Sequence, residues 1–156
     1  MNLRILAVGA RMPDWVTQGF EEYAKRLPRE CALSLIEIPL SRRSKTQRRA
    51  GAVAQEGRRM LNQIKDDDQV IALEVGGRSL TTEALAQQFG DWLQDGRDRA
   101  FLIGGPDGLA PECLKRADWR WSLSPLTLPH GLARVVVAEA LYRAWTVLQG
   151  HPYHRA

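Results

Sequence analysis

Short apolar runs alternate with longer segments of helical spacing along this chain. The apolar runs are four to six residues long and predict five strands, over residues 3–8, 33–38, 70–75, 100–103 and 119–124. Apolar spacings of three and four, with Pro and Gly at the segment ends, predict helices over residues 15–27, 46–64, 81–94 and 132–149, and a short helix from residue 111. This alternation predicts the α/β class, with a parallel sheet of about five strands flanked by helices.

Composition predicts one globular domain over residues 1–156. The chain is 44% hydrophobic and 26% charged, which excludes a disordered or fibrous protein. No run approaches the ~18 apolar residues that a membrane span requires, and the first apolar run is too short for a signal peptide. Cys31 and Cys113 have no metal-ligand or redox spacing, so we expect reduced, packed thiols and no metal site. We therefore expect a cytoplasmic protein with no membrane partner.

The positive charge is concentrated in one segment. The whole chain carries +4, from 22 Lys and Arg against 18 Asp and Glu. Residues 42–59 contain seven basic residues and one acidic residue, Glu56, so this segment carries +6 and the rest of the chain −2. An unmixed basic cluster is typical of proteins that bind nucleic acid through its phosphates without reading bases. The candidate RNA contacts are Arg42, Arg43, Lys45, Arg48 and Arg49.

Ligands of parallel sheets bind beyond the carboxyl ends of the strands, which here means residues 74–79, 104–108 and 122–131. The middle segment, Gly104-Gly105-Pro106-Asp107-Gly108, has glycines that allow a ligand to approach the backbone closely. Its spacing matches neither the dinucleotide fingerprint nor the P-loop. Asp107 is its one polar side chain, which favours a neutral or cationic ligand such as a sulfonium-bearing nucleoside. A tight turn that requires positive φ is the alternative.

Residues 122–130, Ser-Leu-Ser-Pro-Leu-Thr-Leu-Pro-His, are unusually apolar for a loop and contain two prolines that restrict the backbone. Such a segment can form an adenine slot, because apolar walls contact the base while backbone groups bond to its edge. A packed crossover loop is the alternative.

The C-terminal segment His151-Pro152-Tyr153-His154-Arg155 contains two of the three histidines. Aromatic, imidazole and guanidinium groups together can stack on a base, bond to its edges and bind a phosphate. His130, the third histidine, lies just ahead of the last predicted helix. The alternatives are a capping or surface role for His130 and a solvated tail.

The last predicted helix is apolar on nearly all sides, whereas a helix buried on one side should have a single apolar stripe. We expect this helix to pack on the sheet and also against a partner subunit, in a two-fold homodimer. Complete burial within one chain is the alternative.

Several of these segments together resemble one family. They are Met12-Pro13-Asp14-Trp15-Val16, the glycine segment with its flanks from Ile103 to Leu109, Leu126-Thr127-Leu128-Pro129-His130, Leu141-Tyr142-Arg143-Ala144-Trp145, and the C-terminal segment. The chain is similar over its whole length to the ribosomal RNA large-subunit methyltransferase H family of the SPOUT superfamily. The resemblance implies a C-terminal trefoil knot that binds S-adenosylmethionine, a homodimer, and methylation of N3 of a pseudouridine in 23S ribosomal RNA on the assembled ribosome.

The resemblance also implies roles for individual residues. The expected cofactor contacts fall in the three segments chosen above and are Leu73, Gly104, Gly105, Leu123, Ser124, Pro125, Leu126, Thr127 and Leu128. The expected catalytic residues, which hold the pseudouridine, are His130, Tyr153, His154 and Arg155, with the tail supplied by the neighbouring subunit. A SPOUT enzyme that acts on another RNA, such as transfer RNA, and a non-catalytic RNA-binding or ribosome-assembly factor are the alternative functions.

Overall fold

A computed structural model describes residues 1–44 and 48–155. Its centre is one sheet of parallel strands in the order β2-β1-β4-β3-β5. The strands are β1 Leu3–Val8, β2 Leu33–Ile38, β3 Gln69–Ser79, β4 Arg99–Ile103 and β5 Trp119–Ser122. Every residue of β4 is buried, because this strand lies in the middle of the sheet and has helices on both faces. The predicted fold class and the five predicted strands are confirmed.

The helices follow the strands in alternation. They are α1 Asp14–Ala24, α2 Arg49–Leu61, α3 Thr82–Asp95, α4 Pro111–Arg116 and α5 His130–Gln149, with short 3-10 turns η1 Arg29–Cys31 and η2 Pro152–His154. The ends of α3 have clear local causes: the Thr81 hydroxyl accepts a hydrogen bond from the Ala84 amide at 3.0 Å, and Gly96 has φ +71°. The predicted start of α2 at residue 46 lies outside the described residues.

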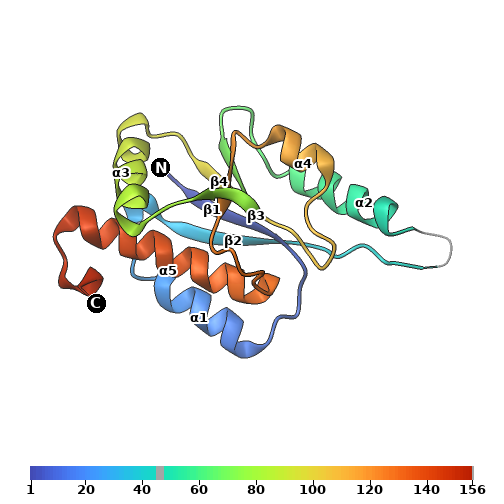
Figure 1. The fold of residues 1–156 in the computed structure, drawn as a ribbon, viewed down its shortest axis with the longest axis horizontal. Coiled ribbons are helices and arrows are strands. Elements are labelled where there is room, and N and C mark those ends of the chain that lie inside the picture. Colours follow the sequence, from blue (N-terminus) through green and yellow to red (C-terminus); the bar gives the residue numbers. More distant parts are fainter. Residues whose placement is uncertain (45–47, 156) are drawn as a thin grey trace.

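The helices form two layers on the sheet (Figure 1). On one face, α1, α3 and α5 cover a core that includes the ring contacts Trp92–Phe101 and Phe101–Trp121, with centroids 5.8 and 6.1 Å apart. On the other face, α2 and α4 cover a smaller core that includes Met60 and Cys113. Apolar area removed from water on both faces stabilises this three-layer arrangement.

The surroundings of α5 show which of its faces are covered within one chain. This helix lies between α1 and α3, so neighbours of its own chain cover it on two sides as well as on the sheet face. The packing against α1 is close, since a Cβ added at Gly19 would lie 3.2 Å from the side chain of Val135. Part of the apolar surface of α5 is therefore used within one chain, while Leu148 is exposed and other apolar side chains of the helix, such as Val136 and Trp145, are half-buried. The homodimer stays a prediction.

Strand β3 also differs from the prediction, because it continues past residue 75 to Ser79. Its pairing with β5 shifts register between Leu73 and Arg78, so residues predicted as a loop form an irregular strand end. Gly77 permits this, since a Cβ there would lie 2.7 Å from the backbone of Arg120. Strand β5 ends at Ser122, two residues earlier than predicted, and the proline-containing loop begins directly after it.

Both cysteines, Cys31 and Cys113, are buried free thiols, as predicted. Burial raises the pKa of each thiol to about 11, so both are protonated at neutral pH. Among the described residues, no helix is long and apolar enough to cross a membrane. The same residues contain no group of three or more His, Cys, Asp or Glu side chains placed to hold a metal ion.

Candidate cofactor pocket and RNA surface

A pocket of about 800 Å³ opens at the carboxyl ends of β3, β4 and β5. Three separate segments line it: residues 73–76 of β3, residues 103–109 after β4, and most of residues 123–130 between β5 and α5. The three loops expected from the sequence to bind a ligand therefore lie together. Of the predicted cofactor contacts, Leu73, Gly104, Gly105, Leu123, Ser124, Leu126, Thr127 and Leu128 line the pocket. Pro125 does not line it.

The glycine loop after β4 folds back on itself. The Gly108 amide donates to the Gly105 carbonyl at 3.0 Å, and Gly108 has φ +81°. Gly104 packs against this return, since a Cβ there would lie 2.5 Å from the Gly108 carbonyl carbon. The tight turn weighed as an alternative is therefore present, and the same turn is also one wall of the pocket. Glycine at these positions leaves backbone, rather than side chains, facing a ligand.

The loop between β5 and α5 is held by its own serines and leaves other backbone groups free. The Ser122 hydroxyl donates to the Ser124 carbonyl at 3.0 Å, and the Ser124 hydroxyl accepts from the Leu126 amide at 2.9 Å. Within the described part of the chain, the amides of Thr127 and Leu128 donate to no protein acceptor. Apolar side chains and unpaired amides at one pocket wall are the features expected of an adenine slot.

Asp107 does not face the pocket as a free carboxylate. The Arg43 guanidinium donates to Asp107 Oδ2 through Nε at 3.0 Å, and Arg49 Nε lies 3.2 Å from Asp107 Oδ1. Arg43 also donates to Glu56, which is 2% exposed. The expectation that the basic cluster has no compensating acid is therefore wrong for Arg43 and Arg49, because the acids come from α2 and from the glycine loop.

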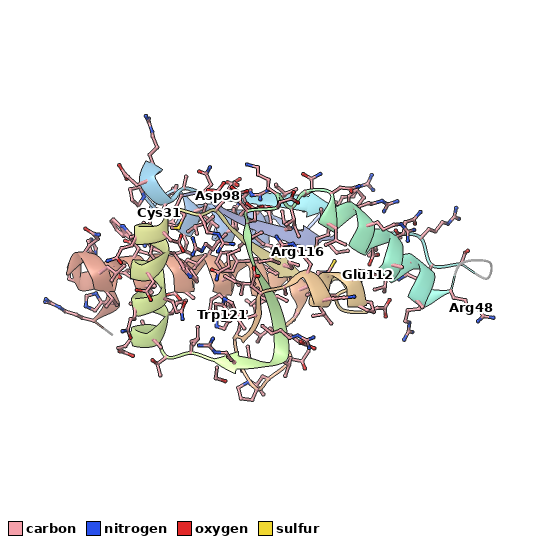
Figure 2. All side chains as sticks on the ribbon, turned by 90° about the horizontal axis from the view of Figure 1, so that it is seen from above. Cys31, Arg48, Asp98, Glu112, Arg116 and Trp121 are labelled. Atoms are coloured by element: carbon pink, nitrogen blue, oxygen red, sulfur yellow. The ribbon has the colours of Figure 1, made fainter. Side chains whose placement is uncertain are left out.

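The other members of the predicted RNA cluster remain solvent-facing. Arg42 and Arg48 are exposed, and neither pairs with an acid among the described residues. Figure 2 shows Arg48 at the outer end of α2, away from the sheet. Lys45 lies outside the described residues. A phosphate contact of Arg42, Arg48 and Arg49 stays a prediction.

His130 is the first residue of α5 and lines the pocket, half-buried. It also borders a second hollow that is lined by Gly9, Met12 and Pro106, so its imidazole lies at the junction between the two. No side chain caps the start of α5, which leaves the positive end of the helix dipole at this wall of the pocket. This placement suits a residue that contacts an acceptor group beside the pocket.

The C-terminal tail is docked on α5 by Tyr153. The Tyr153 hydroxyl donates to Glu139 Oε1 at 3.0 Å, and the same carboxylate accepts from Arg143 Nε at 2.8 Å. The Tyr153 ring lies 4.7 Å from the Tyr142 ring, and Arg26 stacks beside both rings. Burial, with hydrogen bonds that include the one to Glu139, raises the pKa of Tyr153 above its ordinary value. These contacts give Tyr153 an anchoring place in the structure, with its hydroxyl already engaged.

His130 is the first residue of α5, and the C-terminal tail follows its other end (Figure 1). The helix has 20 residues, which at 1.5 Å rise per residue makes it about 30 Å long. Within one chain the structure therefore does not bring His154 and Arg155 to the pocket that His130 lines. The imidazole Nδ1 of His154 is buried and has no hydrogen-bond partner among the described residues.

Comparisons with known proteins agree with this geometry. The family model described as "Predicted SPOUT methyltransferase" matches residues 1–154. The chain belongs to the SPOUT methyltransferase family. Proteins named ribosomal RNA large subunit methyltransferase H are similar over full length: the one from Alkalilimnicola ehrlichii is 57% identical over 100% of both chains, and the one from Chromohalobacter salexigens is 56% identical over 99% of this chain and 100% of its own.

A solved structure supports the fold of this SPOUT methyltransferase. A probable methylase family protein from Haemophilus influenzae Rd KW20 superposes with a TM-score of 0.56, over 97% of this chain and 69% of that one. The two sequences are 15% identical, so this likeness concerns the fold alone.

Several pocket residues of this SPOUT methyltransferase were missed by sequence reasoning. They are Leu114, Trp121 and Ala133. Glu74 and Val75 also line the pocket, and both fall within residues 74–79, which the sequence indicated as a ligand segment. Leu114 and Ala133 gave no signal, because each lies on a helix whose other apolar residues pack in the core.

Proposed function

We propose that this SPOUT methyltransferase transfers a methyl group from S-adenosylmethionine to N3 of a pseudouridine in 23S ribosomal RNA on the assembled ribosome. The observation that carries the proposal is the 52–57% identity, over the whole chain, to proteins named ribosomal RNA large subunit methyltransferase H. The pocket at the carboxyl ends of β3, β4 and β5 supports it.

The pocket fits the proposed cofactor. Unpaired amides of Thr127 and Leu128 would bond to the adenine edge, and Leu73, Leu123 and Leu126 would contact its faces. Backbone at Gly104 and Gly105 would lie against the rest of the nucleoside. S-adenosylmethionine supplies, when bound, an electrophilic methyl group on a sulfonium. The carboxylate of Asp107 is engaged in ion pairs with Arg43 and Arg49, so we do not assign it a contact with the sulfonium.

The protein residues have to position the acceptor and handle one proton. As the bond from N3 to the methyl carbon forms and the carbon–sulfur bond breaks, the imide proton of N3 has to leave. A base, or a cation that stabilises the imidate, lowers this barrier. We assign the hold on the pseudouridine to His130 at the pocket and to His154 and Arg155 of the tail. Tyr153 then serves that site through its anchor on Glu139 and Tyr142.

Within one chain, about 30 Å separates His130 from the tail residues His154 and Arg155. In a homodimer, the tail of one subunit can reach the pocket of its partner. An exposed apolar side chain outside the pocket supports the presence of a partner: Trp15 is 57% exposed in the single chain. In this arrangement each active site contains residues from both subunits.

The described residues are built around a single sheet, with no separate RNA-binding module beside it, so we infer that the folded ribosome supplies most of the recognition. Whole ribosomes or large subunits are the expected substrates, and short hairpin transcripts are expected to be poor ones.

The proposed function is tested by mass mapping of ribosomal RNA from a strain that lacks this protein. One 23S pseudouridine should lose a methyl group, and purified protein with S-adenosylmethionine should restore it on large subunits. Loss of a methyl group from a transfer RNA instead would assign the protein to another RNA. Unchanged methylation of every RNA would indicate a non-catalytic factor, and both results contradict the proposal.

A further inference from the structure

Arg43 lies between two carboxylates that come from different parts of the fold. Its guanidinium donates to Glu56 of α2 at 2.5 Å and to Asp107 of the glycine loop at 3.0 Å, and it also donates to the Ser41 carbonyl at 2.7 Å. This one side chain thus joins residues 41–43, helix α2 and the glycine loop.

The acidic partner on α2 is almost fully buried. Glu56 is 2% exposed and accepts from the Ser41 amide at 2.9 Å in addition to Arg43. The hydrogen bond to Glu56 is the largest cause of a raised pKa of Arg43, so this guanidinium is charged at all working pH values. A buried carboxylate without a paired cation lowers the stability of the fold. The guanidinium of Arg43 is therefore held beside Glu56.

The glycine loop packs closely on β1, since a Cβ added at Gly105 would lie 2.9 Å from Val8, but few polar contacts fix it. Its internal hydrogen bond runs from the Gly108 amide to the Gly105 carbonyl. Among the described residues, its side-chain hydrogen bonds and ion pairs to the rest of the chain all run through Asp107. Asp107 and both glycines line the pocket. The conformation of this pocket wall therefore depends on where Arg43 holds Asp107.

Arg49 differs from Arg43 although both contact Asp107. Arg49 is 78% exposed and makes one contact at 3.2 Å, whereas the Arg43 side chain is 26% exposed and engages both acids. An exposed ion pair of this kind contributes little and is easily exchanged for a phosphate. Arg42 and Arg48, which have no acidic partner among the described residues, are available in the same way.

We propose that Arg43 is a positioning residue for the cofactor pocket, which acts through Asp107, and that the RNA phosphates are bound by its neighbours Arg42, Arg48 and Arg49. This division of one basic cluster rests on the proposed function, since it assumes S-adenosylmethionine in the pocket and RNA outside it. It reassigns Arg43 from the RNA surface, where sequence composition placed it, to the cofactor site.

The test is calorimetric titration of the full-length protein with S-adenosylmethionine, which needs no RNA and no turnover. Arg43→Ala should weaken binding about tenfold. Asp107→Asn should weaken it similarly, and the double variant should be no weaker than the worse single variant, because both remove the same link. Additive losses in the double variant would overturn the proposal.

Arg4→Ala is the matched control. Arg4 also pairs with an almost fully buried carboxylate, that of Asp68 at 1% exposure, but it lies near the amino end of β1, away from the pocket. Both variants should lower the melting temperature, and only Arg43→Ala should change cofactor affinity. If Arg43→Ala does not fold, Arg43→Lys is measured instead. It keeps the charge but loses the planar fork that reaches two acids, and about threefold weaker binding is expected.

Variants of the proposed RNA-binding arginines should affect ribosome binding and not cofactor binding. Arg42→Ala and Arg48→Ala should raise KM for ribosomes and leave the Kd of S-adenosylmethionine unchanged. Cofactor binding by Arg43→Ala equal to that of the wild type would overturn the inference and leave the proposed function intact. A wild-type protein that gives no heat with S-adenosylmethionine would overturn the proposed function, and the inference with it.

Discussion

The two ends of α5 differ in the kinds of residues that surround them. At the amino-terminal end, beside His130, the pocket is walled largely by backbone, by glycines and by apolar side chains. At the carboxyl-terminal end, the tail is held by the tilted ring contact between Tyr153 and Tyr142 and by Glu139, which accepts from both Tyr153 and Arg143. One chain therefore forms the whole proposed cofactor pocket, but the tail residues that we propose to bind the acceptor lie at the other end of the helix.

The largest effect is expected from removal of the tail. Deletion after Gly150 should lower methylation of large subunits by about 1,000-fold or more, because the acceptor loses His154 and Arg155 together. The Kd of S-adenosylmethionine should stay within about twofold of the wild-type value, since the pocket lies at the far end of α5. Single-turnover methylation and calorimetry measure the two quantities.

A second variant distinguishes the loss of the tail's functional side chains from the loss of the tail's packing on α5. Deletion also removes Tyr153 from its place against Tyr142, so the double substitution His154→Ala with Arg155→Ala is the better comparison, because it keeps this anchor. It should reproduce most of the loss while the melting temperature stays near that of the wild type. Wild-type turnover in the deletion variant would show that the tail has no part in the reaction.

A smaller effect is expected at the other end of the helix. His130→Ala should lower the methylation rate about 100-fold, the range usual for loss of one group that assists proton transfer. Because His130 forms one part of the pocket edge, cofactor should still bind and the loss should appear in kcat rather than in the KM for S-adenosylmethionine. Unchanged turnover with cofactor bound would remove His130 from catalysis.

The fold was predictable from the sequence because its signals are local. Apolar runs such as Leu3–Val8 and Leu33–Ile38 are strands with those same bounds. Gly96 ends α3 in the left-handed conformation that its position suggested. The extension of β3 to Ser79 was not predictable, since it depends on the register shift against β5, a contact between segments far apart in the chain.

The residues that line the pocket could be predicted from the sequence, whereas the ion pairs around it could not. The loops at the carboxyl ends of parallel strands lie at the same edge of the sheet. The sequence could therefore predict that Gly104, Thr127 and Leu73 lie in one pocket. The pairing of Arg43 with Glu56 and Asp107 could not, because no local pattern places α2 and the glycine loop around one guanidinium. Counting charges along the chain therefore overestimated the free positive surface.

The most direct test of the two-ended site is a purified mixed dimer. One subunit carries the deletion after Gly150 and keeps His130, and its partner carries His130→Ala and keeps the tail. Each parent homodimer should retain no more than about 1% of the wild-type rate. If the tail acts in the partner's pocket, the mixed dimer has one intact site out of two and should methylate large subunits at about half the wild-type rate. A mixed dimer as inactive as its parents would contradict the account, because it would mean that His130 and the tail of the same chain must work together.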